Sequence, residues 1–180
     1  LLRRPFRIVR IGPVRLFVND LAEAEAFYRD VLGFALTERI TYEGQDCVFL
    51  RCNTEHHSLA LYTLALRDRL ELRPDSTCMS FGLQLANYRQ LRDAVSFLRE
   101  RGCRIRELPA QLFPGIGPSV FVFDPDGHAV QLYAYMEQVG WGGQPRPAEL
   151  RPPVLLGTWP ETLPALSDVF AGEPYLGPWG

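Results

Sequence analysis

The sequence predicts an α+β fold in which two tandem βαβββ modules form a cup-shaped mixed sheet, followed by an extended C-terminal arm. Two observations support this prediction. Strand-like and helix-like segments occur twice in the same order within residues 1–137, and such an internal repeat indicates a duplicated unit. Residues 138–180 break this pattern and are rich in Pro, Gly and Trp. We therefore expect one paired-module domain and one arm.

The first module is expected at about residues 8–66. A β-branched, apolar stretch at residues 10–18 predicts its first strand. Asp20 is followed by Glu23, which is typical of a capped helix start, and apolar residues then recur at helical spacing as far as Gly33, which is expected to end the helix. Three further strand-like segments follow, at residues 34–40, 46–52 and 57–64.

The second module is expected at about residues 78–137 and has the same order. Its first strand is predicted at residues 80–85, and Asn87 is expected to cap a helix that ends at Gly102. The starts of the two modules align without a gap, residues 14–20 with residues 81–87. Three strands complete the module, at residues 103–108, 119–123 and 129–135, with a turn at residues 124–127 between the last two.

Composition excludes several classes of protein. The chain has 180 residues, 47% of them hydrophobic, which is enough for one globular core. A net charge of −2 with interspersed signs gives no basic surface for nucleic acid, and no apolar run approaches the ~20 residues of a membrane span. Neither CxxC pairs nor a dense framework is present, so reduced thiols in a cytoplasmic protein are expected for Cys47, Cys52, Cys78 and Cys103.

The start of the chain and its C-terminal arm each allow a separate prediction. The sequence begins at Leu1 without a Met, so we expect it to be part of a longer protein. In the arm, residues 161–170 are compatible with a short helix, and Trp141, Trp159 and Trp179 argue against a disordered tail, because such tails rarely keep large aromatic residues. We expect the arm to pack along the domain or across a partner subunit of a homodimer, the alternative being a free tail.

Three segments resemble a known superfamily. Residues 27–34 (FYRDVLGF) and 123–133 (FDPDGHAVQLY) resemble the vicinal oxygen chelate proteins, which include glyoxalases, bleomycin-resistance proteins and extradiol dioxygenases. Residues 49–61 (FLRCNTEHHSLAL) resemble the extradiol ring-cleavage dioxygenases more specifically. The resemblance implies a cup that holds Fe(II) or Mn(II) through two His and one Glu, a ligand set that leaves positions open for substrate and oxygen.

The expected metal ligands are missing from this sequence. The resemblance places them near the start of each module's first strand and in its last strand. These positions hold side chains that either lack a donor or bind divalent transition metals poorly: Pro13, Ala60, Ser80 (the alternative is Met79) and Gln131. We therefore predict no metal and no other cofactor; Fe(II) or Mn(II) is expected only if the chain is a dioxygenase with an unusual ligand set.

The histidines are a second group of candidate functional residues. The resemblance implies that His57, in a His-His-Ser context after His56, lies near a substrate hydroxyl and shuttles protons. Imidazole suits this role because its pKa lies near neutrality. The structural alternative is a histidine at a strand start that is bonded to backbone. His128 is the repeat mate of His57, and we expect it to stabilise its turn only.

Strand alternation predicts which side chains line the cup. Convergent polar groups among rings are typical of a small-molecule site, in which Arg15 would anchor an anionic oxygen. The alternatives are a closed cup whose polar groups satisfy each other, and an Arg15 paired with Glu38 or Glu107. Residues 113–118 are expected to border the cup. The predicted inner face holds Pro13, Arg15, Phe17, Ala60, Tyr62, Ser80, Gly82, Gln84, Gln131 and Tyr133; facing the helices are Val14, Leu16, Phe81, Leu83, Val130 and Leu132.

Three functions are compatible with these observations. The first is a metal-free domain that binds a small aromatic or anionic molecule through Arg15, Ser80, Gln84 and Gln131, with the two tyrosines stacking on it. The second is an enzyme, either an extradiol-type dioxygenase or a metal-independent lyase or isomerase that uses His57. The third is a structural half of a longer two-domain protein. None of them involves nucleic acid or a membrane.

Overall fold

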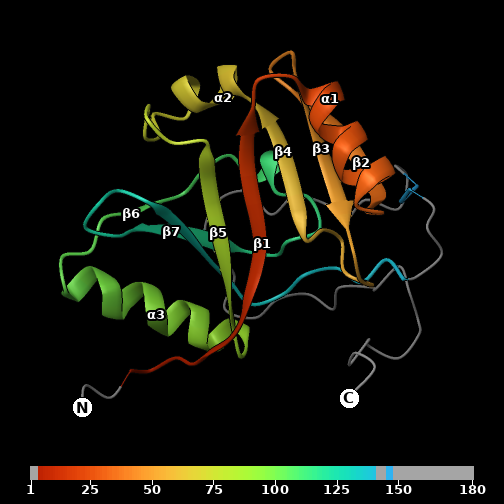
Figure 1. Ribbon diagram of the computed structural model, residues 1–180. Coiled ribbons are helices and arrows are strands. Elements are labelled where there is room, and N and C mark those ends of the chain that lie inside the picture. Colours follow the sequence, from red (N-terminus) through yellow and green to blue (C-terminus); the bar gives the residue numbers. More distant parts are fainter. Residues whose placement is uncertain (1–3, 141–144, 148–180) are drawn as a thin grey trace.

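The computed structural model describes residues 4–140 and 145–147 and confirms the α+β prediction. Its strands form one eight-stranded mixed sheet in the order β2-β3-β4-β1-β5-β8-β7-β6 (Figure 1). The first module comprises β1 (Ile8–Val18), α1 (Leu21–Ala26) with a π-helical turn η1 (Phe27–Val31), β2 (Ala35–Tyr42), β3 (Gln45–Arg51) and β4 (Leu59–Thr63). The second comprises β5 (Cys78–Leu85), α3 (Tyr88–Glu100), β6 (Ile105–Arg106), η2 (Ala110–Leu112), β7 (Ser119–Phe123) and β8 (Ala129–Tyr133), and α2 (Leu64–Arg69) connects the two modules.

Local signals explain where the helices α1 and α3 begin and end. The Asp20 side chain accepts a hydrogen bond from the Glu23 amide at 2.9 Å, and Asn87 caps α3 in the same way. Gly33 and Gly102 follow the two helices with φ values of +79° and +69°, a conformation that glycine adopts without strain. The predicted capping and ending residues are therefore confirmed.

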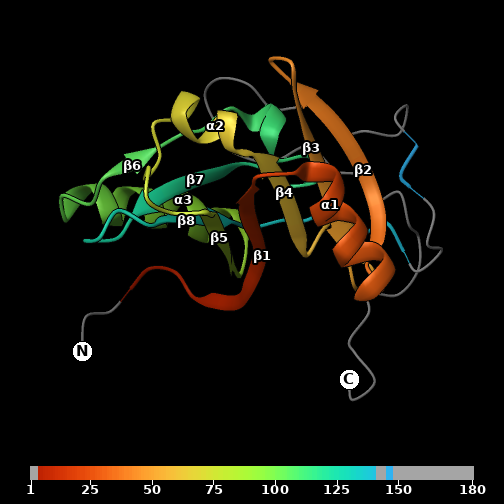
Figure 2. The same ribbon diagram turned by 45° about the horizontal axis from the view of Figure 1, so that its top comes forward.

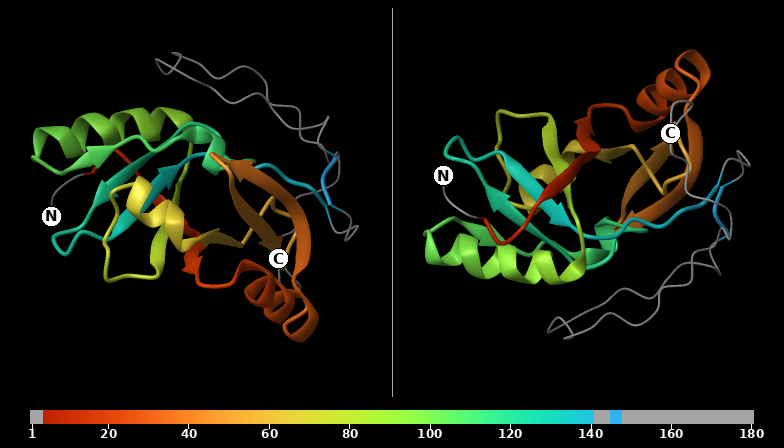
Figure 3. Two further views of the ribbon diagram at one scale, coloured as in Figure 1. Left: turned by 90° about the horizontal axis from the view of Figure 1, so that it is seen from above. Right: turned by 90° about the horizontal axis from the view of Figure 1, so that it is seen from below.

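Strand pairing relates the two modules by an approximate twofold axis. β1 and β5 lie antiparallel at the centre of the sheet, and β4 and β8 lie parallel to them on their outer sides. Figure 2 shows one module on each side of this central pair. The helices lie at opposite ends of the molecule, each against its own module (Figure 3).

Two segments differ from the sequence prediction. The strand expected at residues 103–108 has only two residues, Ile105 and Arg106, because β7 pairs with these two alone. Residues 64–69, which follow β4, form α2 and contribute the fully buried Leu66 to the core. Propensity alone does not reveal so short a helix, because its stability comes from tertiary packing.

Three apolar clusters form the core. Leu16 lies in the cluster under α1, whereas Leu83, Val130 and Leu132 lie under α3, as strand alternation predicts. The prediction was wrong for Val14, which is 39% exposed. It belongs to the central strand β1, which lies between α1 and α3 (Figure 1).

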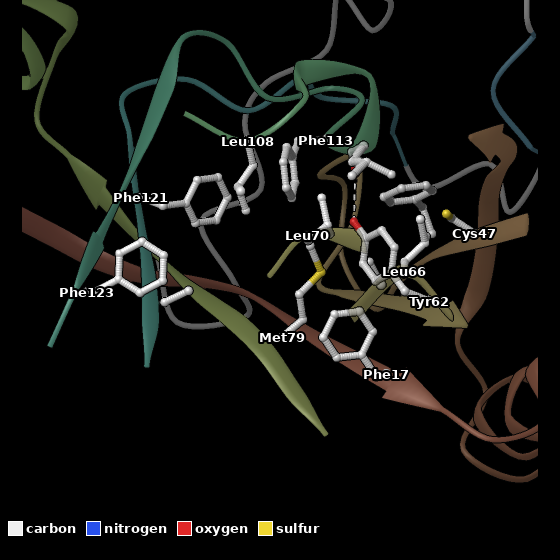
Figure 4. Close-up of a cluster of buried hydrophobic side chains, with 14 residues drawn as sticks. Phe17, Cys47, Tyr62, Leu66, Leu70, Met79, Leu108, Phe113, Phe121 and Phe123 are labelled. Carbon is white, nitrogen blue, oxygen red and sulfur yellow. Dashed lines mark hydrogen bonds between the residues drawn. The ribbon is translucent and has the colours of Figure 1, made fainter. Parts of the chain in front are cut away.

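The third cluster fills a large part of the cup. Side chains from both modules meet there, including Phe17 and Tyr62 from the first and Phe113 and Phe121 from the second (Figure 4). The Tyr62 hydroxyl donates a hydrogen bond of 2.7 Å to the Leu112 carbonyl across the cup. The inner face is therefore more apolar than the sequence analysis expected.

The end of the chain is described only in part. Arg146 donates its backbone N–H to the Thr37 carbonyl at 2.7 Å and thus attaches the start of the arm to β2. The three tryptophans and the helix expected at residues 161–170 lie outside the described residues. In the described ranges, no helix has the length and apolar character needed to cross a bilayer. All four cysteines are free thiols.

Candidate functional site

Arg15 lies at the centre of the cup. β1 carries it opposite Ser80 of β5 and beside Ala60 of β4, and its side chain is fully buried. The guanidinium contacts the Ser80 Oγ at 3.4 Å and the His57 Nε2 at 3.5 Å, and it lies 5.0 Å from the centre of the Phe113 ring. Burial lowers the pKa of Arg15. These contacts are long, and the Arg15 Nε has no hydrogen-bond partner.

Within the described part of the chain, Arg15 makes no ion pair with a carboxylate. Glu38 instead binds Arg146 and His56, each at 2.9 Å. Glu107 is exposed on the second module. The alternative in which Arg15 pairs with Glu38 or Glu107 is therefore wrong.

A line of polar contacts leads away from Arg15. His57 lies shortly before β4, with Ser58 between them, and its Nδ1 is 2.9 Å from the Nδ1 of His56. The Nε2 of His56 is in turn 2.9 Å from the Glu38 Oε1. Both imidazoles are fully buried, and the pKa of His57 is lowered well below its usual value by burial first and then by the charges of His56, Arg15 and Arg146. The partners of His57 are side chains, so the alternative of a backbone-bonded histidine is not what the structure shows.

Arg146 closes the far end of this line. Its side chain is fully buried, and it contacts Glu38 at 2.9 Å and the two oxygens of Glu137 at 3.2 and 3.0 Å. Its guanidinium also lies 3.1 Å from the His56 Nε2. Both modules and the arm thus contribute to one buried polar network.

The amides and the tyrosines of the predicted site are fixed by neighbouring groups. Gln131 donates to the Ser119 Oγ at 2.8 Å, whereas its Oε1 is buried without a hydrogen-bond partner. Gln84 donates to the Ala134 carbonyl at 3.4 Å. The ring of Tyr133 fills the space above Gly12 and Gly82, and burial raises the pKa values of Tyr62 and Tyr133.

The residues at the family's ligand positions do not fit a metal ion. Ser80 is paired with Arg15 in the sheet, so a cation already occupies the region where a metal would lie. Pro13 and Ala60 have no donor atom, and the neutral oxygens of Ser80 and Gln131 are poor ligands for iron or manganese. Elsewhere in residues 4–140 and 145–147, no three His, Cys, Asp or Glu side chains are arranged to hold a metal ion.

One loop, residues 113–118, lies against the cup, as the sequence analysis expected. Phe113 stacks near the Arg15 guanidinium. A Cβ added at Gly115 would lie only 2.2 Å from the Cγ of His56, so this backbone packs directly on the imidazole ring. The loop therefore closes the cup above Arg15 and the histidine pair.

Sequence reasoning named Glu38 only as an alternative partner of Arg15, and it missed Glu137 and Arg146. A charged residue at a buried strand position is a usable signal for Glu38, which lies in β2. Glu137 lies beyond the end of β8, and nothing in the Pro-rich context of Arg146 marks it as buried. His128 was predicted to be structural, and this is confirmed: it is exposed, and its ring contacts Asp124 in the same turn at 3.0 Å.

Comparison with known proteins supports the resemblance. The family model described as the Glyoxalase/Bleomycin resistance protein/Dioxygenase superfamily matches residues 10–132. The chain therefore belongs to this superfamily.

Individual relatives are ring-cleavage dioxygenases. The chain is 31% identical to a 2,2',3-trihydroxybiphenyl dioxygenase of Sphingomonas paucimobilis, over 76% of this chain and 42% of the relative. It is also 31% identical to a metapyrocatechase of a Pseudomonas species, over 90% of this chain and 47% of the relative. The structure of homoprotocatechuate 2,3-dioxygenase from Arthrobacter globiformis is similar, with a TM-score of 0.59 and 30% identity over 73% of this chain and 38% of that one. The chain thus spans less than half the length of these relatives.

Proposed function

We propose that the chain is a binding domain of extradiol-dioxygenase type, which holds a small aromatic anion in its cup without a metal. Arg15 binds the anionic oxygen of a phenolate, enolate or carboxylate. One observation carries the proposal: the guanidinium is fully buried, has an unpartnered Nε and makes no ion pair with a carboxylate of the described chain.

Energetics favour an anionic partner for this guanidinium. A buried charge is costly unless it is paired, and one unsatisfied buried donor costs ~1–3 kcal/mol. The nearest carboxylate along the polar line is Glu38, which lies beyond two imidazoles and already binds Arg146. Phe113 stabilises the cation only in part, since such a contact contributes about 0.5–2 kcal/mol. An oxyanion could accept two parallel N–H bonds from the planar guanidinium.

The aromatic side chains that line the cup support an aromatic ligand. Phe113 and Phe121 lie on one side and Tyr62 on the other. The names of the relatives point the same way, because they act on a trihydroxybiphenyl and on homoprotocatechuate. A planar ring could occupy the place of the Phe113 side chain over Arg15 once residues 113–118 move outward.

Titration calorimetry with benzoate and catechol tests this function. Wild type should bind at least one of them with submillimolar affinity. Arg15→Met keeps the length of the side chain but removes its charge, and it should weaken binding about 10- to 150-fold, equivalent to ~1.5–3 kcal/mol. Arg73→Met, which removes an arginine paired with Asp75 at the surface, is the matched control. Equal affinities of wild type and Arg15→Met would contradict the proposal.

A second candidate is a supporting half of a longer dioxygenase-like protein. Two observations favour it: the chain spans 42% and 47% of the two curated relatives named above, and Ile8, Val9, Ile11 and Val14 of β1 are exposed. Exposed large apolar residues are typical of an interface where they form a contiguous patch. Sedimentation of wild type and Ile11→Lys tests this candidate. A concentration-dependent association that the substitution abolishes would support it, whereas a strict monomer would not.

A further inference from the structure

We propose that Arg146 is a positioning residue that latches the loop of residues 113–118 in the place where it keeps ligands away from Arg15. The loop has to move outward before a ligand can reach the guanidinium, and Arg146 opposes this movement through Glu137. The inference rests on the proposed binding function for its ligand-dependent part. It gives the first residues of the arm a role in controlling access to the cup.

Arg15 cannot be reached from solvent unless a neighbouring segment moves. Its side chain is fully buried, and the buried ring of Phe113 has its centre 5.0 Å from the guanidinium. Phe113 is the first residue of the loop, which connects η2 to β7. The other contacts of Arg15 come from Ser80 in the central strand β5 and from His57 close to β4. A connecting loop opens more readily than a central strand, so the loop is the segment whose movement uncovers Arg15.

Backbone pairing with residues 135–137, called the pairing segment below, holds the middle of the loop. Two hydrogen bonds of 3.2 and 2.7 Å and one antiparallel bridge join Gly117 with Tyr135, Glu137 with Gly115, and Ile116 with Met136. Pro114 and Pro118 flank this stretch and have no N–H to donate to other strands. The position of the loop therefore depends on the position of the pairing segment.

Glu137 connects the pairing segment to the first module and to the arm. Its carbonyl accepts from the His56 N–H at 2.8 Å, and its buried carboxylate contacts the Arg146 guanidinium at 3.2 and 3.0 Å. Arg146 also donates to the Glu38 carboxylate at 2.9 Å, and its backbone N–H donates to the Thr37 carbonyl at 2.7 Å. Both of these acceptors belong to β2. Arg146 thus bridges the pairing segment to β2 through buried, charge-assisted hydrogen bonds, which are stronger than neutral ones.

Loss of this bridge should make the loop easier to open. A buried carboxylate that loses a charged partner turns toward solvent or takes up a proton, because a buried charge is costly without compensation. Either change disturbs Glu137, whose backbone N–H bonds directly to the loop. The open form then becomes more populated. Apparent affinity for a ligand rises in proportion to the fraction of protein that is able to bind it.

The latch and the ligand act against each other. The proposed binding mode puts the ring of the ligand where the Phe113 side chain now lies, so the bound state has an open loop. Coupling of this kind is reciprocal: a closed loop weakens ligand binding by the same factor by which the ligand weakens the closed loop. A saturating ligand should therefore expose the loop to solvent, whereas a lid that closes over its ligand would become more protected.

Native-state hydrogen exchange tests the latch without any ligand. The Gly117 amide reports opening of the loop, and the amides of α3 report global unfolding. In Arg146→Met the Gly117 amide should exchange at least tenfold faster than in wild type, through a local opening that low concentrations of urea hardly change. Arg106→Met, which removes a surface arginine, is the matched control and should exchange as wild type does. Equal acceleration of Gly117 and α3, with the same urea dependence, would show a loss of general stability only and would overturn the latch.

A double variant separates the latch from stability. Arg146→Met/Glu137→Gln removes the carboxylate charge together with the guanidinium, so it should be more stable than Arg146→Met, but it still lacks the bridge to β2. Its Gly117 amide should remain at least tenfold faster in exchange than that of wild type. A return to the wild-type rate would contradict the latch. This variant takes the place of Arg146→Met if the single variant does not fold.

Benzoate, or catechol if only that compound binds, tests the control of access. Calorimetry should show at least tenfold tighter binding to Arg146→Met than to wild type, and saturating ligand should accelerate Gly117 exchange in wild type. Equal affinities, or slower Gly117 exchange with ligand, would overturn the latch and leave the Arg15 site standing. Failure of every protein to bind either compound would overturn the proposed function instead, and exchange in the free proteins would still decide whether Arg146 holds the loop.

Discussion

Arg146→Met should be among the most destabilising single substitutions in the described chain. The arginine side chain is fully buried and forms ion pairs with both Glu38 and Glu137, which are themselves almost completely buried. Removing one partner of a buried ion pair costs about 3–5 kcal/mol, because the remaining charge is left without compensation. A domain of this size has a total stability of only ~5–15 kcal/mol.

Urea denaturation followed by circular dichroism measures this loss. The melting temperature should fall by about 6–20 °C, because a loss of 1 kcal/mol in stability lowers it by ~2–4 °C in domains of 150–250 residues. Arg106→Met is the control: its ion pair with Glu71 spans 3.7 Å at the surface, and such pairs contribute about 0–1 kcal/mol. The double variant Arg146→Met/Glu137→Gln should recover part of the loss. A loss for Arg146→Met no larger than for the control would refute the assignment of a buried, charge-compensating role.

Four further outcomes are expected. Gly115→Ala should cost more than ~1–2 kcal/mol, because φ is +74° and the new methyl group meets His56; Gly117→Ala, whose Cβ would lie 3.5 Å from its nearest neighbour, should be almost neutral in the same melting assay. Elemental analysis of protein purified without added metal should find no stoichiometric iron, manganese or zinc, and one tightly held ion per chain would contradict this. His57 has a depressed pKa in the folded state, so its contribution to stability is complete above the unfolded value of about 6.5 and is lost as pH falls; His57→Gln, unlike His128→Gln, should flatten the acid limb of the stability curve. Cys52 and Cys78 are exposed and should react first with a thiol reagent, whereas burial raises the pKa of Cys47 to about 12 and should keep it unreactive until unfolding.

Local chemistry explains why most of the fold was predictable. Capping by Asp20 and Asn87 and strand alternation act over a few residues, so the sequence displays them directly. Alternation also placed Arg15 and Gln131 on the inner face, where both are fully buried. It failed at Val14, because the exposure of that residue depends on where the helices lie and not on the strand itself.

Partners within the site could not be predicted in the same way. The contact between Arg146 and Glu38 joins residues that are 108 positions apart, and no local pattern encodes it. The same holds for Gly115 packing on His56. Long-range pairing of this kind depends on the finished sheet, so the sequence indicated which side chains enter the cup but not which of them bind each other.

The charge arrangement of the cup suggests how such a domain could retain part of the chemistry of its superfamily. Arg15 lies opposite Ser80, and Ser80 holds a position where the resemblance places a metal ligand. The Arg15 guanidinium supplies one positive charge and parallel N–H donors, but unlike a metal ion it offers no coordination positions. A guanidinium can hold an oxyanion, yet it lowers the pKa of a hydroxyl less effectively than a divalent ion. A second group that removes the proton would then be needed. The histidine pair begins 3.5 Å from the guanidinium and ends on a carboxylate, so His57 lies beside any oxyanion that Arg15 would hold.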